Sequence, residues 1–128
     1  MKIAVSAVGE DLDAAVDPRF GRCRYFLLVD EATMRFEAVP NEAAMSGGGA
    51  GIQAAQIVAD KGADVVLTGN VGPNAFRTLS AAGIKVITGV SGSVRSALER
   101  YKRGELRGAD RPNVEGHYGI GRGMGRGR

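Results

Sequence analysis

The sequence predicts an α/β protein, a three-layer α/β/α sandwich built on a mixed five-stranded sheet. Three observations lead to this fold class. Two strand-like runs in the first half are separated by a three-residue turn, strand-like runs alternate with helical patterns in the second half, and glycines mark the turns between them. The expected strands cover residues 2–8, 25–30, 34–39, 64–68 and 84–88, and the expected helices cover about 50–61, 73–82 and 93–102.

The first three strands are predicted from composition and alternation. Residues 2–8 form a short apolar run that is typical of a buried strand. Residues 25–30 are rich in aromatic and aliphatic side chains, while residues 34–39 alternate apolar with charged side chains. We therefore expect a hairpin whose second member, the third strand, lies at an edge of the sheet.

The three helices are predicted from periodicity and from their end signals. Pro73 suits the first turn of the second helix and Gly83 its end, while Ser93 can cap the third. In the first helix, apolar residues recur at helical spacing: Ile52, Ala55, Ile57, Val58 and Ala59. Because strands joined by helices pair in parallel, the later strands should run parallel to the first.

Four loops are expected to meet beyond the carboxyl ends of the parallel strands, where α/β sheets bind ligands. They cover residues 9–24, 45–51, 69–74 and 89–93. The first is a long polar loop, and loops of that length in compact domains are often functional. Cys23 lies on it and is expected to face the N-termini of all three helices.

A dense run of glycines immediately precedes the first helix, at Gly47, Gly48, Gly49 and Gly51. Glycine lets the main chain approach a ligand closely, and the N–H groups at a helix start attract anions. Asn70, Asn74 and Ser91, in the later turns, are expected to line the same edge, although Asn74 is as plausibly a hydrogen-bonding residue at a helix start. The alternative is a loop that is tight for packing alone. A dinucleotide site fits poorly, because a hairpin strand replaces the first β-turn-α unit.

Length and charge indicate one folded domain, residues 1–103, followed by a Gly/Arg-rich flexible tail, residues 104–128. The net charge of +3 is due to three tail arginines, Arg122, Arg126 and Arg128. The folded body therefore has no general basic surface, and nucleic acid is not an expected partner of it. The tail could contact RNA, acidic partners or metal, although an inert end is the simpler description.

The sequence predicts a cytoplasmic protein. It has no apolar run long enough to span a membrane and no basic-then-apolar leader, so neither a membrane span nor a signal peptide is expected. Its single cysteine, Cys23, excludes an internal disulfide and fits a reducing compartment.

Four motifs together resemble the dinitrogenase iron–molybdenum cofactor-binding family, which includes NifX-type carriers and the C-terminal domain of NifB. They are Phe20-Gly21-Arg22-Cys23-x-Tyr25-Phe26, Gly49-Ala50-Gly51, Gly69-Asn70-x-Gly72-Pro73-Asn74-Ala75 and Gly83-Ile84-x-Val86. The resemblance covers about residues 1–103. It implies a ribonuclease H-like sheet of strand order 3-2-1-4-5 with the second strand antiparallel, and binding or delivery of an iron–sulfur-type cluster.

One position departs from the family pattern. Some members have a histidine just before the Phe-Gly-Arg motif, where this chain has Arg19. The only histidine, His117, lies in the tail. A cluster ligated by a histidine of the folded body is therefore excluded.

Cys23 is the candidate metal ligand, and Arg22 the candidate supporting donor. Positive charge from Arg22 and Arg24 should lower the pKa of the Cys23 thiol, and thiolate is a natural ligand of iron. The alternatives are a buried, small apolar role for Cys23 and a salt bridge from Arg22 to Asp13 or Asp17. One cysteine cannot hold a cluster alone, so the cluster would arrive preassembled or be shared across a homodimer.

Two functions follow as hypotheses. The first is a non-enzymatic carrier of an iron–sulfur or iron–molybdenum-type cluster, with cluster donor and acceptor proteins as partners. The second is a small regulatory or scaffold module that binds a phosphorylated or other anionic ligand, or a protein. The folded body offers no histidine and no nucleophile–base pair, which argues against an enzyme.

Overall fold

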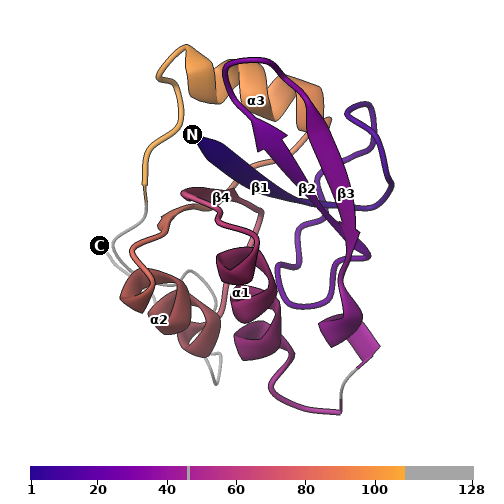
Figure 1. Cartoon of the computed structure of the whole chain (residues 1–128), viewed down its shortest axis with the longest axis vertical. Coiled ribbons are helices and arrows are strands. Elements are labelled where there is room, and N and C mark those ends of the chain that lie inside the picture. The colour runs from indigo at the N-terminus through magenta and orange to yellow at the C-terminus, as the bar shows by residue number, and fades with distance from the viewer. Residues whose placement is uncertain (46, 109–128) are drawn as a thin grey trace, which may run out of the picture.

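The computed structural model describes residues 1–45 and 47–108 (Figure 1). Its strands are β1 (Lys2–Ala7), β2 (Tyr25–Asp30), β3 (Phe36–Pro40), β4 (Val65–Leu67) and β5 (Lys85–Ile87). Its helices are α1 (Ala50–Asp60), α2 (Pro73–Ala81) and α3 (Val94–Lys102), with a short 3₁₀ helix, η1, at Glu42–Met45. The predicted element order is confirmed, and only η1 was not expected.

The five strands form one mixed sheet in the order β3-β2-β1-β4-β5. β1 pairs antiparallel with β2 and parallel with β4, and β4 pairs parallel with β5. β2 also pairs antiparallel with β3, which therefore lies at an edge. This is the order, and the single reversed strand, that the family resemblance implied.

Two hydrophobic clusters, one on each face of the sheet, give the three layers. α1 and α2 cover one face, where Val58 and Leu79 pack with Val66. α3 covers the other, where Leu98 packs with Leu67 and with Leu12 from the loop 9–24. Figure 1 shows α3 on one side of the strands and α1 with α2 on the other.

Local differences from the predicted boundaries have identifiable causes. β3 begins at Phe36 rather than at residue 34, because Met34 adopts a left-handed backbone (φ 64°) and donates its N–H to Asp30 in the turn. In α1, Ile52 was expected on the buried face but is exposed. Ala55 and Val58 of the predicted pattern are buried, and Ala50 and Ala54 are buried with them.

The predicted convergence of the four loops is confirmed. Isolated bridges join Ala15 to Ser93 and Arg19 to Asn70, so the loop 9–24 contacts the loops after β4 and β5. The same loop meets the start of α1, where a Cβ on Gly21 would lie 3.1 Å from the Cα of Gly51. Beyond α3, Leu106 packs against the second hydrophobic cluster. Most of the predicted tail, including His117, lies outside the described residues.

Candidate functional site

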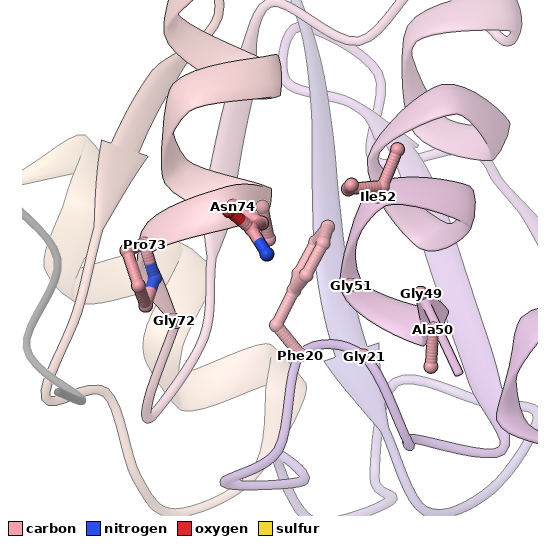
Figure 2. A pocket seen from close by; sticks show the side chains of 10 residues that line it. Phe20, Gly21, Gly49, Ala50, Gly51, Ile52, Gly72, Pro73 and Asn74 are labelled. Carbon is pink, nitrogen blue, oxygen red and sulfur yellow. The ribbon is translucent and has the colours of Figure 1, made fainter. Parts of the chain in front are cut away.

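A pocket of about 240 Å³ lies between the N-terminal ends of α1 and α2. It is lined by two helix starts, 49–52 and 72–75, and by Phe20 and Gly21 of the loop 9–24. Figure 2 shows the Phe20 ring between the two helix ends, with Asn74 of α2 on one side and Ile52 of α1 on the other.

The start of α1 presents backbone N–H groups to this pocket. Gly49 is the N-cap residue in a left-handed conformation (φ 70°), and no side chain caps the helix. The amide of Gln53 makes the first i to i−4 bond of the helix, to the Gly49 carbonyl (3.0 Å). The N–H groups of Ala50, Gly51 and Ile52 precede it and have no partner within the helix.

The start of α2 has the same character. Its N-cap residue is Gly72, again without a side-chain cap, and Pro73 follows at the first position, where a missing N–H costs nothing. Phe76 donates to the Gly72 carbonyl (3.0 Å), so the N–H groups of Asn74 and Ala75 lie in the uncapped first turn.

Small residues bring the two helix starts together. A Cβ on Gly51 would lie 3.1 Å from the Cβ of Ala75, so no larger residue fits at this contact without displacement. The positive ends of the two helix dipoles consequently point into one pocket, where they favour negative charge.

The start of α3 is different, and here the sequence prediction was wrong. Its amides are already bonded: Val94 donates to Ala14 (2.9 Å), Arg95 donates to Leu12 (2.8 Å), and Ser96 donates to the Ser93 side chain (3.0 Å). The loop 9–24 thus covers this helix end. Two helix starts, rather than three, line the pocket.

Cys23 does not line the pocket. Its side chain is fully buried in the hydrophobic cluster beneath α1 and α2, where it contacts the Phe20 carbonyl (Sγ to O 3.4 Å) and lies near the Asn41 amide (3.7 Å). Burial, together with the negative charge of Asp17, raises the pKa of the Cys23 thiol to about 12. The expected lowering of this pKa by neighbouring arginines is therefore wrong, because desolvation outweighs the exposed guanidinium groups.

The arginines of the loop 9–24 lie outside the lining of the pocket. Arg22 donates to the Ala44 carbonyl of η1 (2.8 Å). The two acids proposed as its alternative partners pair with other arginines, Asp17 with Arg19 (3.3 Å) and Asp13 with Arg95 (3.1 Å).

Asn70 holds the loops together. Its side chain and its backbone N–H both donate to the Pro18 carbonyl, at 3.1 and 2.7 Å, and its own carbonyl accepts from Phe20 (3.2 Å). Gly47 and Gly48 are exposed and do not line the pocket, whereas Gly49 and Gly51 do. The roles of all these residues in binding stay predictions.

Asn74, a candidate from the sequence, lines the pocket. The lining residues that the sequence interpretation did not name as candidates are Phe20, Gly21, Ala50, Ile52, Gly72, Pro73 and Ala75. The available signal was the Gly-Pro-Asn turn itself, because a proline at the first helical position leaves the next two N–H groups at the helix start.

The donor set suits an anion better than a bare metal ion. Within residues 1–45 and 47–108, no group of three or more His, Cys, Asp or Glu side chains is arranged to hold a metal ion. The pocket offers N–H donors instead.

Within residues 1–45 and 47–108, no helix is both long and apolar enough to cross a membrane.

Comparison with known proteins gives one curated relative and several solved structures. The apo form of the orange protein from Desulfovibrio gigas is 50% identical, with a TM-score of 0.86, over 88% of this chain and 95% of that one. A NifB-like protein of the DUF35 family from Thermotoga is 36% identical, with a TM-score of 0.73, over 84% and 91%.

The curated relative is an uncharacterized protein of Methanocaldococcus jannaschii. It is 28% identical over 109 residues, which are 83% of this chain and 89% of that protein. The family model described as dinitrogenase iron-molybdenum cofactor matches residues 1–104, which include the whole sheet and all three helices. The chain belongs to the dinitrogenase iron-molybdenum cofactor family.

Proposed function

We propose that this protein is a non-enzymatic carrier that binds an iron–sulfur or iron–molybdenum-type cluster as an anion in the pocket between α1 and α2. The observation that carries the proposal is the pairing of two helix starts without side-chain caps at one pocket. Family membership supplies the class of cargo.

The chemistry of the pocket supports an anionic cluster. Sulfide and other anionic atoms on a cluster accept hydrogen bonds, and backbone N–H groups at the two helix starts can donate them without moving. The Phe20 ring and the Ile52 side chain give the pocket apolar walls, which suit the weakly hydrated surface of a metal sulfide.

Cys23 is not required for this mode of binding. A fully buried thiol whose pKa is about 12 offers almost no thiolate at neutral pH, and Cys23 would have to leave the hydrophobic cluster to reach a metal. We therefore propose that the cluster arrives preassembled and is held by hydrogen bonds and electrostatics. Such binding is easily reversed, as delivery requires.

A carrier needs a donor protein and an acceptor protein, and we propose both as partners, in a reducing cytoplasm. The orange protein, half identical to this chain, has a structure described as an apo form, which is consistent with a protein that also exists with a ligand.

The test is an anaerobic titration of the purified protein with tetrathiomolybdate, a molybdenum sulfide dianion, and with a preassembled iron–sulfur cluster. Three variants accompany the wild type. Asn74→Asp places a negative charge in the pocket, Gln56→Glu adds the same charge on α1 away from the lining residues, and Cys23→Ala removes the thiol. We expect Asn74→Asp to lose at least tenfold in affinity, because the carboxylate repels an anion. Gln56→Glu and Cys23→Ala should stay within about threefold of the wild type.

Two outcomes would contradict the proposal. Binding that survives Asn74→Asp would place the cluster elsewhere, and binding abolished by Cys23→Ala in a folded variant would restore the cysteine as a ligand.

The second candidate function is a regulatory or scaffold module for a phosphorylated ligand. It is favoured by the same backbone donors, since the N–H groups at helix starts form a common phosphate-binding site. Inorganic phosphate that displaces tetrathiomolybdate at equal concentration would support this alternative over the carrier.

A further inference from the structure

A second depression adjoins the pocket along the groove between α1 and α2. It has a volume of about 440 Å³ and is lined by Ile52, Asn74, Arg77, Thr78 and Ala81. Ile52 and Asn74 also line the first pocket, so the two spaces lie next to each other. Arg77 is the only residue with a formal charge among those that line either space.

Arg77 is placed to act on Asn74. The two residues are three positions apart on α2, so their side chains share one face of the helix. The Arg77 guanidinium donates to Asn74 Oδ1 (3.3 Å). With its oxygen held in this way, Asn74 turns its amide nitrogen toward Phe20 and the pocket, as Figure 2 shows.

The charge of Arg77 is not neutralised by an acid in the part of the chain that the structure describes. The ion pairs there use Lys61, Arg19, Arg95 and Arg103. Arg77 has an amide oxygen as its polar partner and keeps its full positive charge at the edge of the groove. It adds a positive end to a groove whose other end holds the two helix starts.

We propose that Arg77 is the residue that selects the charge of the cargo. It orients Asn74 as a donor, and it attracts the end of the ligand that extends beyond the helix starts. The ligand class that fits is a metal–sulfur anion with two or more negative charges distributed along its length, rather than a compact monoanion. This inference rests on the proposed binding site.

The experiment compares two substitutions of Arg77 with a matched loss of charge elsewhere. Arg77→Gln removes the charge, Arg77→Lys keeps it without the planar group, and Arg35→Gln removes another exposed arginine, on the hairpin away from the groove. Tetrathiomolybdate is the dianionic probe and thiocyanate the monoanionic probe. Affinities are measured at several salt concentrations, with the amide NMR signals of residues 50–52 recorded alongside.

We expect Arg77→Gln to weaken tetrathiomolybdate about tenfold and thiocyanate less than threefold, and to flatten the salt dependence of tetrathiomolybdate binding. Arg77→Lys should retain part of the affinity, and Arg35→Gln should match the wild type. The amides of residues 50–52 should still respond in every variant, since the helix starts remain.

The failures are distinguishable. If wild type and Arg77→Gln bind tetrathiomolybdate equally, with shifts at residues 50–52 in both, the role of Arg77 is refuted while the pocket stands. If the wild type binds nothing, or binds with shifts confined to other amides, the proposed site and the role of Arg77 fall together.

Discussion

Asn74 is the residue at which binding and stability should change in opposite directions. It occupies the second position of α2, where the helix dipole favours a negative charge, and it lies within reach of Arg77. Asn74→Asp should therefore raise the free energy of unfolding of the ligand-free protein by about 0.3–1 kcal/mol while it weakens the binding of anions.

Urea unfolding and the tetrathiomolybdate titration, run on the same samples, measure the two effects. Gln56→Glu is the control, since it adds one charge in the middle of α1 and should change neither quantity much. A variant that loses stability and affinity together would mean that Asn74 is merely structural.

Cys23 should make stability depend on alkaline pH. Its pKa is about 12 in the folded protein against an ordinary value of 9.0, so its contribution to stability is fully present below pH 9. Above pH 9, the Cys23 thiol loses its proton in the unfolded chain but keeps it in the folded protein. The free energy of unfolding therefore falls as pH rises, by at most about 1.4 kcal/mol per pH unit.

The measurement is the difference in unfolding free energy between wild type and Cys23→Ala, from pH 7 to 10.5. The comparison removes the titration of lysines and tyrosines, which both proteins share. We expect a constant difference up to about pH 8.5 and then a steady change in favour of the variant. A difference that does not vary with pH would show that the thiol is not buried as described.

The direction of the Cys23 pKa shift could not be predicted from the sequence, for a physical reason. The charges flanking Cys23 are visible in the sequence, and they argue for a low pKa. The sequence does not show that Arg22 and Arg24 are exposed while the thiol lies in the hydrophobic cluster, and this difference in burial reverses the direction of the shift.

The arrangement of the elements depends on one close contact between the loop 9–24 and the turn after β4. A Cβ on Gly69 would lie 2.6 Å from the Cα of Pro18, closer than side chains approach backbone. Gly69→Ala should separate the two segments and disturb the bonds from Asn70 to Pro18, at a cost of about 1–3 kcal/mol.

Gly47→Ala provides the matched control, because a Cβ there meets nothing within 4 Å. Thermal unfolding of the two variants compares the effects directly. We expect a clear fall in melting temperature for Gly69→Ala and little change for Gly47→Ala. Equal effects at the two positions would contradict the packing role of Gly69.

Most elements could be predicted from the sequence because their signals are local. Pro73 and Ser93 mark the starts of α2 and α3, and the alternation in β3 marks an edge strand. The exposure of Ile52 in α1 could not be predicted in the same way. α1 meets α2 through Gly51 and Ala75, while Ile52 beside them is exposed, and periodicity alone does not show how closely the two helices approach.

At the scale of the whole molecule, the fold brings together residues far apart in the sequence. Connections through helices made the parallel pairs predictable, whereas the position of the hairpin beside β1 came from the family resemblance. The edge of the sheet where the four loops meet was predictable from the same rules. Which helix starts remain open there was not, because it depends on how the loop 9–24 folds over α3.

Amide NMR of the ¹⁵N-labelled protein, titrated anaerobically with diamagnetic tetrathiomolybdate, tests the proposed anion site directly. The first-turn amides of α3 serve as an internal control, since their hydrogen bonds are already made within the protein. We expect the largest shifts at Ala50, Gly51, Ile52, Asn74 and Ala75, and small ones at Val94 and Arg95. Shifts spread evenly over all three helix starts, or centred on Cys23 with none at α1 and α2, would contradict the site.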